Sequence, residues 1–153
     1  MIKIRLPFRG DSANTIYADP PWPNYGGGMV ARGANHHYDL MNLDEIEAMA
    51  PEIDRISGDN CHLYLWTTAP HLDRAFNVVT WVKNSIGLGQ YFRGQTEFCL
   101  FAVKGRFPYK SGTGLRSRSC TSNVVFAKKR KHSQKPNKMY KVIESVSYPP
   151  YVE

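Results

Sequence analysis

Asp19-Pro20-Pro21-Trp22 is the stretch of the chain with the clearest chemical potential. The residues before it, 15–18, are β-branched, aromatic or small and predict a short buried strand. Pro20 ends that strand because it has no backbone N–H and restricts Asp19 to extended geometry. A carboxylate, proline carbonyls without a helix or ladder partner and an indole plane thus lie within four residues. They suit a planar heterocycle bearing an amino group, although an ordinary Asp-Pro turn beside a core tryptophan remains the alternative.

A second stretch, Ser133 to Pro136, predicts an anion site. Pro136 suits the first turn of a helix, and apolar residues follow it at helical spacing, at Met139, Val142, Ile143 and Val146. Lys135 and Ser133 therefore lie where free amides, the positive end of the helix dipole and an ammonium converge. The anion is a phosphate or a cofactor carboxylate, and these residues leave that choice open.

The remaining pattern predicts the elements that hold these groups. Further strands are expected at 62–67, 77–82, 96–103, 122–127 and 151–153. Asn42 with Glu45 predicts a capped start of a short helix. A second helix is expected from Pro70 to Phe76. This alternation predicts a three-layer α/β sandwich with a mainly parallel sheet, in which ligands bind at the carboxyl ends of the strands.

The link between the strands at 62–67 and 77–82 is short. A parallel crossover needs a dozen or more residues, and fewer separate these two strands. We therefore expect that a helix segment is missing after Phe76, either through deletion or because residues are absent from the sequence.

Two irregular stretches are expected to face the substrate. The segment 23–37 carries four glycines and leaves directly from Trp22, which is typical of a binding loop. Its paired His36 and His37 have no third ligand nearby, so no metal site is expected. The segment 106–121 carries four cations among glycines and serines and predicts contacts with phosphates.

The overall composition indicates one intracellular domain with a polyanionic partner. The chain has 153 residues, a net charge of +7 and a pI of about 9.4. The basic run 128–131 fits a nucleic-acid patch, and less well a nuclear address. Three widely spaced cysteines predict reduced thiols. No apolar run approaches the roughly 20 residues of a membrane span, and the first residues lack the apolar core of a signal peptide.

Both motifs in this order, Asp19-Pro20-Pro21-Trp22 and then His-Ser-x-Lys-Pro at 132–136, resemble the adenine-amino methyltransferases. That family includes the messenger-RNA adenosine methylase catalytic subunit and phage and bacterial DNA adenine methylases. The segments 81–83 and 87–105 are closest to phage and bacterial members. The resemblance implies a Rossmann-like fold with permuted motif order, in which the catalytic motif precedes the cofactor-carboxylate motif.

The resemblance also implies roles for individual residues. Lys135, assisted by Ser133, would bind the carboxylate of S-adenosylmethionine, and Asp19 would serve both cofactor and catalysis. Three positions would contact the substrate: Tyr38, which with Met41 closes over the target base, Glu97 at the adenine edge, and the basic residue Arg130. Pro20 would offer its carbonyl to the amine, while Pro21 and Trp22 set the plane of the base.

The implied reaction is methyl transfer to the exocyclic amino group of adenine in DNA, giving N6-methyladenine. RNA as substrate, or a non-catalytic nucleic-acid-binding homologue, are the alternatives, and a homodimer stays open. The resemblance places the protein in the cytoplasm of a bacterium or among phage proteins. It also implies a further C-terminal segment for the adenosine half of the cofactor, beyond Glu153.

Overall fold

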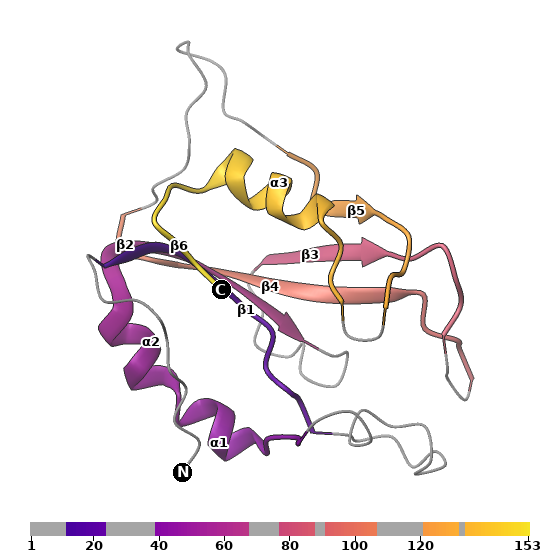
Figure 1. Cartoon of the computed structure of the whole chain (residues 1–153), viewed down its shortest axis with the longest axis horizontal. Helices are drawn as coiled ribbons and strands as arrows, with labels where there is room; N and C mark the ends of the chain where they lie inside the picture. Colours follow the sequence, from indigo (N-terminus) through magenta and orange to yellow (C-terminus); the bar gives the residue numbers. More distant parts are fainter. Residues whose placement is uncertain (1–11, 24–38, 68–76, 88–90, 107–120, 132–133) are drawn as a thin grey trace.

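The structure is a computed structural model, and it describes residues 12–23, 39–67, 77–87, 91–106, 121–131 and 134–153. Its strands are β1 (Ala13–Ala18), β2 (Ser57–Thr67), β3 (Asn77–Val82), β4 (Thr96–Lys104), β5 (Val124–Phe126) and β6 (Tyr151–Val152). Its helices are α1 (Leu43–Glu47), α2 (Ala50–Ile56) and α3 (Lys138–Val146) (Figure 1).

The strands form one mixed sheet in the order β5-β3-β4-β2-β1-β6. β1 is parallel to β2 and β6, and β3 is parallel to β5. β4 is antiparallel to both of its neighbours, β2 and β3. All strands except β4 therefore point the same way, which confirms the expected mainly parallel sheet.

Helices cover both faces of this sheet, as the three-layer prediction requires (Figure 1). Along β2 the side chains alternate between the faces. Tyr64 and Trp66 pack on the α3 side, in a cluster that includes Met139 and Ile143 of that helix. On the opposite face, Cys61 belongs to a smaller cluster that includes Ile56 at the end of α2, with Leu63 packed against it. The Rossmann-like α/β class predicted from the sequence agrees with this arrangement.

The predicted capping box at Asn42 is confirmed. Asn42 Oδ1 accepts a hydrogen bond from Glu45 N at 2.9 Å, and Glu45 Oε2 accepts one from Asn42 N at 2.8 Å. The helix then breaks after Glu47, and α2 starts with proline near its first turn. The sequence did not predict α2 as a separate helix.

Two element boundaries differ from the prediction for physical reasons. β2 starts at Ser57 rather than at 62, because pairing with β1 and β4 outweighs the poor strand propensity of Gly58, Asp59 and Asn60. α3 starts at Lys138, with Asn137 at its N-cap, rather than at Pro136. Pro136 instead lies in the preceding turn, where its carbonyl accepts a hydrogen bond from Met139 N at 2.9 Å.

Several predictions lie outside the described residues. They concern the helix at 70–76 and any segment after it, most of the loop 23–37 with His36 and His37, and the loop 107–120. Within the described residues, no helix is long and apolar enough to cross a membrane. In the same part of the chain, no group of His, Cys, Asp and Glu could hold a metal ion. Cys61 and Cys99 are buried free thiols.

Candidate active site at the carboxyl edge of the sheet

The strand directions bring three distant segments to one edge of the sheet. β1 runs out at Ala18, so Asp19 lies at its carboxyl end. β4 runs the opposite way, so its first residues lie at that same edge: Thr96 pairs with Val82 at the end of β3, and Phe98 pairs with Thr67 at the end of β2. Glu97, near the beginning of its strand, thereby faces the region where its parallel neighbours end.

The Asp-Pro-Pro-Trp segment is held by hydrogen bonds on both sides. The Pro20 carbonyl accepts a hydrogen bond from Trp22 N at 2.9 Å, and the Pro21 carbonyl accepts one from Met41 N at 2.9 Å. Trp22 Nε1 donates to the Trp66 carbonyl at 2.7 Å. Both proline carbonyls therefore have a partner within the protein, which the sequence did not indicate. A carbonyl has two lone pairs, so each keeps capacity for one further hydrogen bond.

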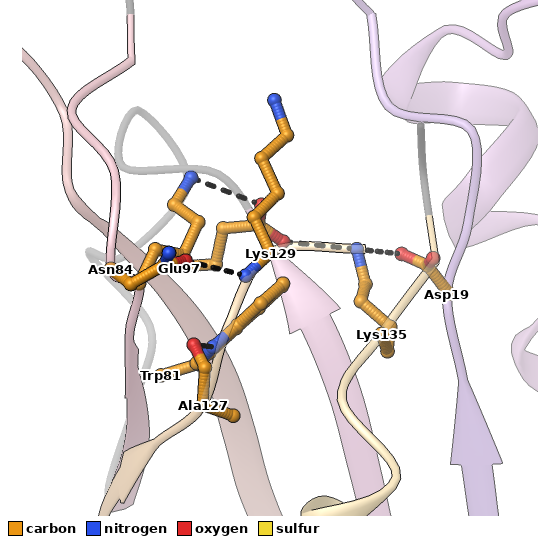
Figure 2. A network of polar contacts seen from close by, with 8 residues as sticks. Asp19, Trp81, Asn84, Glu97, Ala127, Lys129 and Lys135 are labelled. Carbon is orange, nitrogen blue, oxygen red and sulfur yellow. Dashed lines mark hydrogen bonds and ion pairs between the residues drawn. The ribbon is translucent and has the colours of Figure 1, made fainter. Parts of the chain in front are cut away.

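A network of charged side chains connects the segments at this edge. Lys135 Nζ lies 3.1 Å from Asp19 Oδ1 and 3.2 Å from Glu97 Oε2. Lys83, directly after β3, reaches the other oxygen of the same glutamate, with Nζ 3.3 Å from Glu97 Oε1. Figure 2 shows Lys135 between the two carboxylates. Each carboxylate thus has an ammonium partner, and Lys135 joins β1, β4 and the segment before α3.

Both lysines are mostly buried and lie against aromatic rings. The side chains of Lys135 and Lys83 are 17% and 12% exposed. Lys135 Nζ lies 4.9 Å from the ring centroid of Trp66, and Lys83 Nζ lies 5.8 Å from that of Trp81. These are cation–π distances. Each indole is fixed in turn, because Trp66 Nε1 donates to Tyr17 Oη at 2.7 Å and Trp81 Nε1 donates to the Ala127 carbonyl at 2.9 Å.

The Asp19 carboxyl has a raised pKa. Partial burial is the largest cause; the neighbouring Lys135 ammonium opposes it, and the negative charge of Glu97 adds to it. The side chain is still 38% exposed, so solvent and ligands reach it. Such a carboxylate is an under-solvated acceptor whose charge depends on one lysine, and perturbed carboxyls of this kind are concentrated at functional sites.

A cavity of about 640 Å³ opens beside this network. Asp19, Pro20 and Pro21 form one wall, and Lys135 lies on another. Amide, phenol and carboxylate groups of the lining complete the polar part, at Gln134, Asn137, Tyr140 and Glu153. Tyr140 Oη donates to Glu153 Oε1 at 2.6 Å. The cavity therefore offers a cation and a carboxylate side by side, which complements a ligand carrying an anionic and an amino group.

The structure brings together Asp19, Glu97 and Lys135 of the residues predicted from the sequence. Pro20 and Pro21 line the same cavity, whereas Trp22 is bonded to the end of β2 and is not among the lining residues. The guanidinium of Arg130 donates to Asn137 Oδ1, so it lies next to a lining residue. Tyr38 and Ser133 lie outside the described residues.

Sequence reasoning overlooked Lys83 and Trp66 as members of this site. Lys83 directly follows one expected strand, and Trp66 lies near the end of another that runs parallel to β1. Their positions at carboxyl strand ends are the signal that could have identified them, because such ends converge in a parallel sheet.

Comparison with known proteins adds a family and a relative. The MT-A70 family model matches residues 13–151 of this chain. Type II methyltransferase M.MunI of a Mycoplasma species is 28% identical over 162 residues, which covers 86% of this chain and 65% of the relative. The chain therefore spans about two thirds of the length of the relative it matches.

Proposed function

Because this chain belongs to the MT-A70 family of methyltransferases, as its motifs predicted, we propose that it methylates adenine at the exocyclic amino group in DNA, with S-adenosylmethionine as the methyl donor. The whole of residues 1–153 forms one methyltransferase domain in this proposal. The observation that carries it is the pairing of Asp19 with Lys135 on the wall of a cavity at the carboxyl edge of the sheet.

The residues present fit the methyl donor of the family. S-adenosylmethionine ends in an amino acid with an α-carboxylate and an α-ammonium. Lys135 matches the carboxylate, and Asp19, with its acceptor oxygens at the cavity wall, matches the ammonium. The remaining polar lining, including Asn137 and Glu153, can hydrogen-bond to further groups of the donor. When bound, the donor supplies an electrophilic methyl group on a sulfonium.

The chain's own contribution to the reaction is orientation and charge stabilisation. The adenine amino nitrogen is a poor nucleophile because its lone pair is delocalised into the ring. Asp19 and the remaining lone pair of the Pro20 carbonyl accept its two N–H bonds, which aims the nitrogen and stabilises the positive charge that it gains. No covalent bond between enzyme and substrate is needed. In duplex DNA the target base must leave the stack, because its amino group is otherwise paired.

Lys135 and Glu97 have complementary parts in this proposal. Without ligand, Lys135 is shared by two carboxylates, at 3.1 and 3.2 Å. A donor carboxylate would add a further anion to this lysine, and Glu97 would then be free to accept from the adenine edge, with Lys83 still holding its other oxygen. The position expected from the resemblance for Glu97 thus agrees with a place beside the cavity.

The choice of DNA rests on the likeness of the segment 87–105 to phage and bacterial members of the family. Matched DNA and RNA oligonucleotide libraries, incubated with the protein and methyl-labelled donor and then digested to nucleosides, would test it by mass spectrometry. We expect N6-methyldeoxyadenosine from DNA and no label in RNA. Label in N6-methyladenosine from RNA alone would transfer the proposal to RNA, and label elsewhere on the base would contradict it.

Cofactor binding gives a test that does not need the right substrate. Calorimetry with S-adenosylhomocysteine should show binding to the wild type and a large loss in Lys135→Ala. Lys138→Ala is the matched control, because Lys138 is an exposed lysine of the same helix region that does not line the cavity. Absence of binding to a correctly folded wild type would favour the non-catalytic homologue.

A further inference from the structure

The loop between β3 and β4 exposes two adjacent aromatic side chains. Tyr91 and Phe92 are 94% and 93% exposed. Large apolar side chains normally gain free energy by burial, and exposed apolar groups that cluster together often mark an interaction surface. We propose that Tyr91 and Phe92 stack on unpaired bases of the nucleic acid that the candidate active site methylates. This inference rests on the proposed function and adds a substrate-binding surface to it.

The loop is tied to the edge of the sheet that carries the candidate active site. Its two limbs are bridged by hydrogen bonds from Lys83 N to the Gln95 carbonyl at 2.9 Å and from Gly87 N to the Gly94 carbonyl at 2.7 Å. Arg93 Nε also donates to the Gly87 carbonyl, at 2.9 Å. The limbs start at Lys83 and return to β4 at Thr96, next to Glu97. The aromatic pair therefore projects from a braced loop beside the charged network.

A row of cations lies beside the same loop. The chain leaves β5 through the exposed basic run 128–131, and Lys129 N donates to Asn84 Oδ1 of the outgoing limb at 2.9 Å (Figure 2). With Arg93, this surface carries five cations, and the described residues of 83–95 and 121–131 include no acidic residue. Phosphates match such a charge.

Aromatic rings next to cations are the combination that binds single-stranded or unpaired nucleic acid. Cations follow the phosphates, while rings stack on bases without demanding a particular sequence. A methylase that extrudes its target base from a duplex needs partners for the bases that are left unstacked. A second copy of this chain could also cover an aromatic patch, but two such copies would bring the cations of both together.

The test measures binding of a fluorescein-labelled single-stranded DNA 20-mer by anisotropy, without methyl donor. A strand of the same length with abasic sugars carries the same charge but no rings. We expect Tyr91→Ala/Phe92→Ala to weaken binding of the base-bearing strand about tenfold or more and to leave the abasic strand unchanged. Tyr91→Leu/Phe92→Leu, which keeps apolar area but no π face, should show the same loss. Equal effects on both strands, or none, would overturn the proposal.

Charge variants separate phosphate contacts from stacking. Lys128→Gln/Lys131→Gln should weaken both strands and lower the slope of log affinity against log salt by about 1.4, roughly 0.7 for each phosphate contact. The matched control is Lys104→Gln/Arg106→Gln, two exposed cations at and just beyond the end of β4, at the opposite edge of the sheet. It should change neither strand's binding.

Two further readouts keep this proposal distinct from the catalytic one. Light scattering should give the same mass for the wild type and the Tyr91→Ala/Phe92→Ala variant. A wild-type dimer that the variant converts to a monomer would instead assign the aromatic pair to a contact between copies. S-adenosylhomocysteine binding should be equal in both proteins. Failure of methyl transfer with intact base-dependent DNA binding would refute the proposed function alone.

Discussion

Two polar networks tie the flanks of α3 to the sheet, and they differ in charge and exposure. After the helix, Ser147 Oγ lies 2.6 Å from His62 Nδ1 and 2.8 Å from Tyr64 Oη. All three residues are at most 2% exposed. Before the helix, Lys135 joins Asp19 and Glu97, whose side chains are 38% and 33% exposed.

This difference separates a network that holds the fold from one that can exchange partners. Ser147, His62 and Tyr64 are neutral, and a hydroxyl shared within a dry core fixes one arrangement. Lys135 has two anionic partners and opens on a cavity, so a ligand carboxylate can join or replace one of them without breaking the core. Charge and partial exposure, rather than the number of hydrogen bonds, mark the second network as the functional one.

The largest effect is expected from Asp19→Asn. The amide keeps the shape but loses the charge that would stabilise the methylated nitrogen, so methyl transfer should fall by about 10²–10³-fold or more. Stability should not fall, because burial raises the pKa of Asp19 and the folded protein already disfavours its charged form. Tritium transfer and thermal unfolding on the same sample test both statements. Near wild-type activity would exclude Asp19 from the chemistry.

Ser147→Ala should have the opposite profile. The substitution removes only the hydroxyl shared by His62 and Tyr64, which leaves buried groups without that partner and should lower the free energy of unfolding by about 1–3 kcal/mol. Methyl transfer per folded molecule should be unchanged. Urea unfolding measures the first effect and initial rates well below the unfolding midpoint measure the second. An activity loss as large as that of Asp19→Asn would break the distinction between the networks.

Lys83→Met should have a smaller, selective effect. Methionine keeps apolar contact with Trp81 but removes the ammonium 3.3 Å from Glu97. We expect kcat/KM for nucleic acid to fall about tenfold, near 1.4 kcal/mol, and S-adenosylhomocysteine affinity to stay within about twofold. Lys104→Met, which removes a comparable ion pair with Asp54 at the other end of β4, is the control. Equal losses in both variants would indicate a general charge effect.

The smallest effect concerns pH and the neutral network. Burial lowers the pKa of His62 below its usual 6.5, so the unfolded chain binds a proton at that residue more readily. Stability from this residue is therefore present above pH 6.5 and is lost as the pH falls toward the lowered value, by at most about 1.4 kcal/mol per pH unit. His62→Asn should flatten that part of the unfolding profile. An unchanged profile would show that other groups cause it.

Much of the fold followed from local pattern. β3 has the predicted bounds, and the capping box at Asn42 forms because its two hydrogen bonds join residues only three positions apart. Longer-range pairing hid the rest. The first residues of β2 are poor strand formers that only β1 and β4 hold in place, and α2 follows a break that the apolar spacing did not reveal.

The sequence by itself determined the chemical types of the site: a carboxylate that a proline holds at the end of a strand, and a lysine just before a helix. Those features depend on neighbouring residues and can be read along the chain. Only the tertiary structure decided that Asp19, Glu97 and Lys135 meet, because the reversed direction of β4 turns the start of that strand toward the ends of the others. The same geometry added Lys83 and bonded Trp22 to β2. Strand direction is a property of the whole sheet, so no local pattern carries it.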